Sequence, residues 1–437
     1  MKAALAVYIS TMFLLHGLAP LPVASFGFMI ALATLLIYLV GQGQAGGLRQ
    51  LAIRLDDSLF VSIFILGLLA IGVNVSSIGT QNFVHSAIWL ITWLVCFWWV
   101  REWLLISRIS FRTISKAAAI GVAMLSASVL LEFVIANLYG KYLSDYIYFS
   151  IHNFPSANVL GDILVRPRGF ASEAGFTAIV FECLLPISLL WVLEDRTRKI
   201  AFWVIVVPAY LLLFSAASLS CLFLTLLVWA ALRWGWIRAF SVAVILALVA
   251  AALFSAFDDA LFVANELVFR KYLEFAPDDI TIHADSFSRP EAYELAVKIL
   301  TNYPAGLGWG AISQHAADHH AILDTPLKGS GLISFPLEIG ASAGVTGMLI
   351  YLIIIGKKLA RLAGRADLAA KSVFFATLWV SLHHTVVLEA WFPMIWFCLA
   401  LADRIALSGN EPKRLTKGRA IASKAVPSIR NVRCQNS

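Results

Sequence analysis

The sequence predicts an all-α polytopic membrane protein with about 12 transmembrane helices and two extended loops on one side of the membrane. Of its 437 residues, 60% are hydrophobic and only 14% are charged, whereas about a quarter of the residues in a soluble domain are charged. The 14 tryptophans and 29 phenylalanines suit lipid-facing and interfacial positions. A bilayer is therefore the solvent that this composition fits.

Twelve apolar runs approach the length that a membrane-spanning helix needs, which is about 17–25 residues. The runs lie near residues 4–20, 22–41, 58–77, 83–100, 116–138, 173–193, 200–216, 217–232, 238–257, 331–355, 371–388 and 389–406. The divisions at 216/217 and 388/389 are the least marked, and each pair could also be one long run folded back at a tight turn. No small-residue cleavage site follows Lys2 and the first run, so we expect a retained helix rather than a signal peptide.

The distribution of lysine and arginine predicts the orientation. With the N-terminus inside, 25 of the 33 lysines and arginines fall on the inner side and 8 on the outer side. Positive residues favour the cytoplasm, so we predict that both termini are cytoplasmic. The positive residues flank the apolar runs and form no patch, so the net charge of +7 does not indicate nucleic-acid binding.

Two outer segments, residues 139–172 and 258–330, are too long to be simple turns, and long loops often carry function. The transmembrane domain, residues 1–406, includes both of them. The remaining tail, residues 407–437, is basic and poor in large apolar side chains. We expect this tail to be disordered and to lie against anionic membrane lipids.

The five cysteines form no recognisable metal or disulfide pattern. Four lie in apolar runs and one in the tail: Cys96, Cys183, Cys221, Cys398 and Cys434. No pair has the spacing of a CxxC motif or a zinc site. We therefore predict neither a bound metal nor a cofactor.

The stretch Arg166-Pro-Arg-Gly-Phe-Ala-Ser-Glu-Ala-Gly-Phe (the first segment, residues 166–176) places two arginines and Glu173 at the mouth of an apolar run. Charge at such a place is unfavourable unless something binds it, and arginine presents forked donors that suit phosphate or carboxylate. Anchoring by arginines that reach the lipid headgroups is the simpler alternative. Anchoring explains a single arginine well, but it explains two arginines followed by an acid poorly. The combination therefore favours a binding site.

Several ionisable residues inside apolar runs also need partners. Glu132 and Glu182 are unfavourable there unless they are paired. Glu182 follows Glu173 by about 13 Å along a helix, so it is either a deeper cavity residue or a structural partner. His383 and His384 either line a cavity or form a buried hydrogen-bonded pair, and the second interpretation is favoured.

Two further segments complete a pattern. The second segment, residues 288–310, reads Ser288-Arg289-Pro-Glu-Ala-Tyr-Glu-Leu-Ala, with a helix expected over 287–302, and then Pro304-Ala-Gly-Leu-Gly-Trp-Gly. The third segment, residues 330–347, contains Glu338-Ile-Gly and Gly344-Val-Thr-Gly. No strand precedes the second segment's glycines, which argues against a nucleotide-binding loop. Together, and in this order on the predicted outer side, the three segments resemble motifs of the O-antigen polymerase and O-antigen ligase superfamily of bacterial glycosyltransferases.

The chain departs from that superfamily's pattern at three places. Ala174 stands where a proline usually follows the acid, and Ser220-Cys221 replaces a common Ser-Arg pair. The ligase branch commonly has a His-Asn pair just before the third motif. Here His315, His319 and His320 lie upstream, followed by Asp324. This arrangement is more similar to the polymerase branch.

The resemblance implies a GT-C-like glycosyltransferase architecture in a bacterial inner membrane, with the long loops in the periplasm. It implies oligosaccharides on undecaprenyl pyrophosphate as substrates, and a chain-length regulator and a flippase as candidate partners. A diphosphate leaving group needs cations rather than a metal or an acid. The predicted cations are Arg166, Arg168 and Arg289. The predicted general base is His320, His319 or His315, with Glu173 as the carboxylate alternative.

These assignments have structural alternatives. Arg289 is equally well explained by an ion pair with Glu291 or Glu294. A solvated loop position is the commoner explanation for any one of the loop histidines. We rank a polymerase of lipid-linked repeat units first and a ligase or O-oligosaccharyltransferase second. A flippase or proton-coupled exporter ranks well behind, because the chain shows no internal repeat and its unusual charges lie in loops.

Overall fold

The computed structural model describes residues 1–14, 26–45, 54–74, 80–140, 158–159, 164–165, 167–169, 174–213, 215–245, 289–311, 334–386 and 393–408. These residues are almost entirely helical. The only strand pairing among them is a two-residue antiparallel ladder between β1 (Asn158–Val159) and β2 (Leu164–Val165). The predicted histidines of the second loop and the basic tail lie outside the described residues.

The helices follow the predicted apolar runs. They are α1 (Lys2–Ser10), α2 (Phe26–Ala45), α3 (Leu55–Asn74), α4 (Thr80–Thr92), the π-helical η2 (Trp93–Trp99), α5 (Val100–Ile106), α6 (Phe111–Tyr139), α8 (Ala174–Val192), α9 (Arg196–Leu212), α10 (Ala216–Trp234), a helix over Trp236–Ile245, α14 (Arg289–Asn302), α16 (Phe335–Ala363), α17 (Leu368–His383) and α18 (Pro393–Ser408). Six helical stretches in the described part are long and apolar enough to cross a bilayer. This agrees with a polytopic membrane protein, whereas the total of 12 spans remains a prediction.

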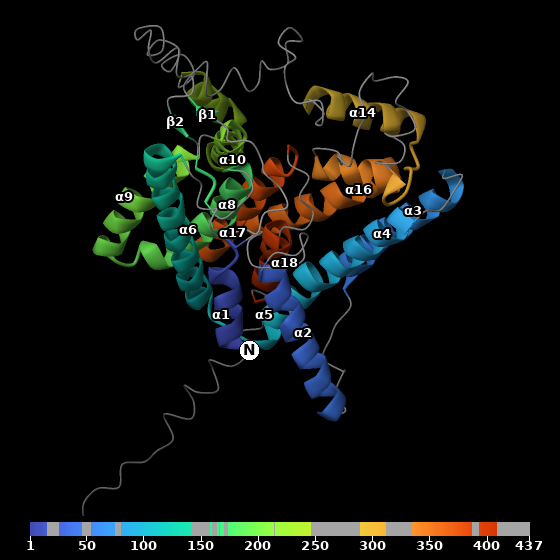
Figure 1. Cartoon of the computed structure of the whole chain (residues 1–437), viewed down its shortest axis with the longest axis horizontal. Coiled ribbons are helices and arrows are strands. Elements are labelled where there is room, and N and C mark those ends of the chain that lie inside the picture. Colours follow the sequence, from blue (N-terminus) through green and yellow to red (C-terminus); the bar gives the residue numbers. More distant parts are fainter. Residues whose placement is uncertain are drawn as a thin grey trace, which may run out of the picture.

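The centre of the bundle is α8, which packs against both α6 and α17 (Figure 1). Small residues on α6, including Ala117, Ala118 and Gly121, allow neighbouring backbones to approach closely, as is common between membrane helices. A Cβ atom at Gly121 would lie 3.1 Å from the Ser10 carbonyl oxygen at the end of α1. Glu182 of α8 and His383 of α17 are both fully buried in this bundle.

One end of the bundle contains a buried group of charges, here called the inner cluster. Its members are Asp56, Asp57, Arg101, Glu102, Lys358 and Asp403, which come from α3, α5, α16 and α18. Arg101 donates hydrogen bonds to Asp57 from both terminal nitrogens, at 2.6 and 2.9 Å. It also donates to Glu102 at 2.9 Å. Lys358 pairs with Asp403 and, at 3.3 Å, with Asp56. Each member is at most 6% exposed.

The inner cluster brings together helix ends that the charge distribution assigns to the same side of the membrane. Arg101 and Lys358 were predicted to be inner-loop cations, but both lie within helices and are buried. Figure 1 shows the N-terminus and α5 at one end of the molecule, with α14 and the β ladder at the other. The N-terminus and α5 therefore lie at the end opposite α14 (Figure 1), and which end faces the cytoplasm remains a prediction.

Helix α16 is interrupted at Gly344, whose backbone adopts φ 75° and ψ 175° inside the helix. Residues 304–308, here called the inserted loop, supply hydrogen bonds at this break. The Leu307 N–H donates to the Ala341 carbonyl at 2.7 Å, and the Gly308 N–H donates to the Ser342 carbonyl at 2.9 Å. In return, the Val345 N–H donates to the Pro304 carbonyl at 3.0 Å.

The inserted loop unites the second and third sequence segments. The preceding helix α14 agrees with the helix predicted over 287–302, and it ends before Pro304 as expected. Its buried residues Ala296 and Ile299 pack in a small apolar core with Ala341 of α16. The glycine-rich stretch thus forms hydrogen bonds at the break in α16 and is not arranged as a nucleotide-binding turn.

Candidate functional site

The structure describes only part of the predicted site. Arg166, Glu173 and the histidines His315, His319 and His320 lie outside the described residues. For Arg289 the described part is its backbone, at the first position of α14. Arg168 is described, and its side chain is half-buried. The site is therefore built from the elements that position these residues.

Glu132 of α6 holds the first segment in place. Its Oε2 accepts the Arg168 backbone N–H at 2.6 Å and also accepts the Gly169 N–H. The Thr177 hydroxyl of α8 donates to the Arg168 carbonyl. Gly169 has φ 62°, and a Cβ there would lie 3.2 Å from the Ser128 hydroxyl. Glu132 therefore has the partners that its place in an apolar run requires.

This anchor gives a testable expectation for Glu132→Leu. The substitution leaves two backbone N–H groups without their acceptor, each of which costs about 1–3 kcal/mol when buried. We expect the first segment to detach, which exposes the Arg168–Gly169 bond to trypsin, whereas proline protects the Arg166–Pro167 bond. Trypsin treatment of membrane vesicles, followed by mass analysis of the fragments, measures this change.

Glu132→Gln is the matched control, since its amide oxygen still accepts hydrogen bonds. We expect its digestion pattern to resemble that of the wild type. Equal resistance of Glu132→Leu and the wild type would show that the carboxylate does not hold the first segment.

A second group of polar side chains, here called the outer cluster, surrounds Glu182 of α8. Glu182 Oε1 accepts from the Ser218 hydroxyl of α10 at 2.5 Å and contacts His383 Nδ1 of α17 at 2.6 Å. Ser218 also contacts the Tyr210 hydroxyl of α9 at 2.6 Å. Trp379 Nε1 donates to the Ser218 carbonyl at 3.2 Å. Helices α10 and α17 therefore contact one carboxylate oxygen of α8, and α9 reaches it through Ser218.

The carboxylate and the imidazole of the outer cluster are buried, but not all of their polar atoms are hydrogen-bonded. Glu182 and His383 are both 0% exposed. Glu182 Oε2 and His383 Nε2 are buried and have no hydrogen-bond partner in the described structure. Buried polar atoms are usually satisfied, so these two atoms retain unused hydrogen-bonding capacity.

The end of α17 joins all three sequence segments. His383 contacts Glu182 of the helix that the first segment enters. The next residue, His384, accepts through its carbonyl the N–H of Phe335, in the third segment, at 2.9 Å. The carbonyl of Thr385 accepts from the Tyr293 hydroxyl of α14, in the second segment, at 2.8 Å. Three consecutive residues thus contact the second segment, the third segment and the helix that follows the first segment.

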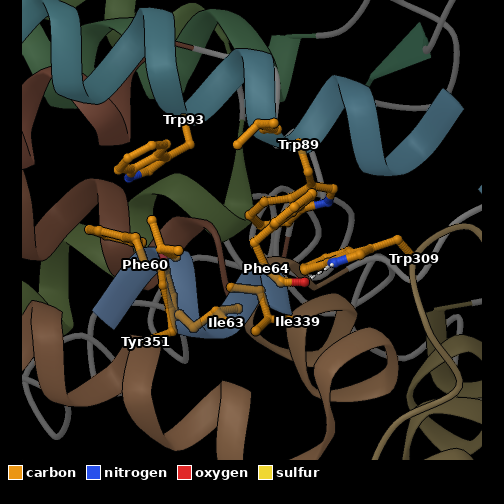
Figure 2. A pocket seen from close by; sticks show the side chains of 10 residues that line it. Phe60, Ile63, Phe64, Trp89, Trp93, Trp309, Ile339 and Tyr351 are labelled. Atoms are coloured by element: carbon orange, nitrogen blue, oxygen red, sulfur yellow. Dashed lines mark hydrogen bonds between the residues drawn. The ribbon is translucent and has the colours of Figure 1, made fainter. Parts of the chain in front are cut away.

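An apolar pocket lies beside this junction (Figure 2). Its lining consists of Phe60, Val61, Ile63, Phe64, Trp89, Leu90, Trp93, Trp309, Ile339 and Tyr351. The Trp309 indole, which directly follows the inserted loop, donates to the Phe64 carbonyl at 3.1 Å. Asn82 donates to the Trp309 carbonyl at 2.9 Å. A Cβ at Gly67 would lie 2.2 Å from the indole nitrogen, so only glycine leaves room for this ring.

Aromatic rings link the pocket to the end of α17. Phe335 stacks on Trp89 with ring centroids 5.3 Å apart and an interplanar angle of 5°. The same ring lies 5.5 Å from His384. Trp89 also packs against Trp309 at 4.6 Å. Polar and apolar parts of the site are therefore in continuous contact, which suits an amphipathic ligand.

Sequence reasoning found part of this arrangement. It expected Glu182 to need a partner if buried, and it favoured a buried hydrogen-bonded pair for His383 and His384. Both histidines are buried, and His383 is paired with Glu182. Sequence reasoning missed Ser218, Tyr210 and Trp309. The available signal for Trp309 was its position between two glycines, and Ser218 lies at the start of a helix.

Comparison with known proteins adds no family assignment, since no family model matches this chain and no curated protein matches its sequence. The arguments about its role therefore come from its own residues. One is the apolar pocket together with the polar residues beside it. The other is the buried pair of Glu182 and His383. Segments that carry arginines lead into the same helices.

Proposed function

We propose that this protein polymerises oligosaccharide repeat units carried on undecaprenyl pyrophosphate, at the periplasmic face of a bacterial inner membrane. The product would be a surface polysaccharide such as an O-antigen, a capsule or an exopolysaccharide. In this reaction an acceptor sugar hydroxyl attacks the anomeric carbon of a second lipid-linked unit. The lipid diphosphate leaves, and no metal or cofactor takes part.

The contacts made by residues 383–385, at the end of α17, are the observation that supports this proposal. Phe335 and Tyr293 come from the third and second segments, and Glu182 lies on the helix that follows the first segment. The arginines of the first and second segments belong to the same end of the bundle in the predicted orientation. Cations gathered there would bind the diphosphate and stabilise the charge that develops as it leaves.

The apolar pocket supports a lipid-linked substrate rather than a free sugar. Its lining is aromatic and aliphatic, and it lies among helices long enough to cross a bilayer. The Phe335 ring connects this pocket to the polar junction. Because the pocket is too small to enclose an isoprenoid tail, we expect the tail to lie along these apolar side chains and the polar head to lie at the junction.

A proton-coupled exporter of lipid-linked sugar is the second candidate, and one observation favours it. An ionisable pair inside a membrane bundle, here Glu182 with His383, is a common element of proton-driven transport. A ligase or O-oligosaccharyltransferase would use the same donor and a similar site. The three functions differ in where the glycan accumulates, which makes them separable by experiment.

The proposed function is tested by glycan chain length in a null strain complemented at matched protein levels. We expect Arg166→Ala and Arg289→Ala to shift long chains to single repeat units, because the diphosphate loses its cations. Loss of one transition-state donor typically lowers the rate by about 100- to 1,000-fold. His320→Ala tests the loop histidine in the same assay.

Lys298→Ala is the matched control, since Lys298 lies on the same helix as Arg289 and is exposed. We expect it to retain long chains. Full-length polymer that lacks only its final attachment would indicate a ligase. Lipid-linked units trapped on the inner face would indicate an exporter and would refute the polymerase.

A further inference from the structure

We propose that His383 is the base that removes the proton from the acceptor hydroxyl, and that Glu182 positions it. This inference rests on the proposed function and identifies its proton acceptor within the membrane bundle. The loop histidines and Glu173 were the candidates from sequence. The geometry points instead to a histidine that is held by an acid from another helix.

The hydrogen bonding fixes the orientation of the imidazole ring. Glu182 Oε1 lies 2.6 Å from His383 Nδ1. The same oxygen also accepts from Ser218 at 2.5 Å, so it serves as an acceptor and the proton is on Nδ1. In this neutral tautomer Nε2 carries a lone pair, which makes it the proton-accepting atom.

No other described group forms a hydrogen bond with the Nε2 atom of His383. This atom is also buried. An acid that orients one nitrogen while the other stays open is the arrangement in which histidine acts as a general base.

Helix geometry places the pair near the proposed reaction site. Glu182 follows the start of α8 by about two turns. Tyr210 is near the end of α9, Ser218 is near the start of α10, and His383 ends α17. In the predicted orientation all four helix ends face the periplasm. One residue further, His384 bonds to the third segment.

Other titratable groups also face Glu182. Tyr210 reaches it through Ser218. Cys183 of α8 and Cys221 of α10 lie close enough to interact with it electrostatically. Among the described residues, neither Glu182 nor His383 forms an ion pair with a lysine or arginine, so each is the other's nearest ionisable partner.

The proposed step conserves atoms and charge. The acceptor O–H proton passes to His383 Nε2, directly or through one water molecule, as the hydroxyl oxygen bonds to the anomeric carbon. The anomeric C–O bond to the diphosphate breaks, and the lipid diphosphate keeps the electron pair. The imidazolium, stabilised by Glu182, then releases its proton to water. The glycosyl group has moved, and the histidine is regenerated.

Purified protein in liposomes, supplied with lipid-linked repeat units, provides the test. His383→Asn is the informative variant, because its amide nitrogen still donates to Glu182 but it has no atom at the Nε2 position. We expect its kcat to fall about 100- to 10,000-fold, the usual contribution of a general base. We also expect the KM and the unfolding temperature to stay near those of the wild type.

Two further variants separate chemistry from structure. Lys298→Ala changes an exposed side chain on α14, and we expect its kcat to stay within threefold of the wild type. Glu182→Gln keeps an acceptor for Nδ1–H without the charge, and we expect an intermediate loss of kcat. The wild-type pH–rate profile should show a fall at acid pH that His383→Asn lacks, because that fall reports protonation of the base.

The outcomes distinguish this inference from the proposed function. Wild-type protein that makes no polymer would overturn both. Polymer from the wild type, together with an unimpaired His383→Asn, would overturn only the role of His383. A His383→Asn variant that loses activity in proportion to its unfolding temperature would assign the pair a structural role and would also overturn the inference.

Discussion

Replacing Gly306 with alanine should sharply lower the yield of folded protein. Gly306 has φ 89°, and a Cβ there would lie 2.5 Å from the Gly344 nitrogen and 2.6 Å from the Ser342 carbonyl oxygen. These are rigid backbone atoms that cannot rotate away. Left-handed backbone alone costs an L-residue about 1–2 kcal/mol, and the clash adds to it. Unfolding temperature in detergent and the monodisperse fraction on size exclusion measure the effect.

Gly356→Ala is the matched control for this substitution. Gly356 lies in α16, the helix that the inserted loop contacts, and nothing lies within 4 Å of a Cβ placed there. Alanine is favoured over glycine in a helix by about 1 kcal/mol, so we expect unchanged or slightly higher stability. A Gly306→Ala protein as stable as this control would contradict the insertion of residues 304–308 into α16.

Arg101→Met is the second substitution for which we expect a large effect. Arg101 is 0% exposed and bonds to Asp57 through two nitrogens. Its removal leaves Asp57 and Glu102 buried without their main cation. Breaking a buried ion pair by removing one partner typically destabilises a protein by about 3–5 kcal/mol. The free energy of unfolding in mixed micelles, or the thermal midpoint, would report this loss.

Arg361→Met tests whether the burial of Arg101 is the reason for the large loss of stability expected in Arg101→Met. The Arg361 side chain is 45% exposed and lies 3.7 Å from Asp56. Exposed ion pairs contribute at most about 1 kcal/mol, so we expect a small change. Similar losses in the two variants would mean that the inner cluster is not sealed from solvent as the geometry indicates.

The helices were the most predictable feature of the chain. Each of the twelve apolar runs contains a described helix, and the doubtful division near residue 216 is a real one, since α9 ends at Leu212 and α10 begins at Ala216. This success has a simple cause. In a bilayer every backbone polar group must be satisfied within its own segment or barrel, so apolar runs have few alternatives to a helix.

The pairing of charges was much less predictable. Glu132 and Glu182 were recognisable as groups that need partners, but Glu182 finds His383 at a separation of 201 residues. Glu132 finds two backbone N–H groups rather than a side chain. A single sequence shows which groups are unfavourable when unpaired, and only the packing of helices determines which of them meet.

The break in α16 could not have been foreseen. Gly340, Gly344 and Gly347 are spaced like the small residues at an ordinary membrane-helix interface. Of these three, Gly344 alone leaves the helical conformation. Its difference from the others depends on the inserted loop, whose position follows from tertiary structure rather than from local sequence.

The inserted loop also has a consequence for biosynthesis. An interrupted helix exposes carbonyl and N–H groups, and each costs several kcal/mol in hydrocarbon if nothing bonds to it. Residues 304–308 are translated before residues 341–345, so the segment that satisfies the break has already left the ribosome when α16 enters the membrane. The order of synthesis therefore allows α16 to insert together with its partner. A circular permutant that reverses this order should accumulate as a substrate for membrane quality-control proteases.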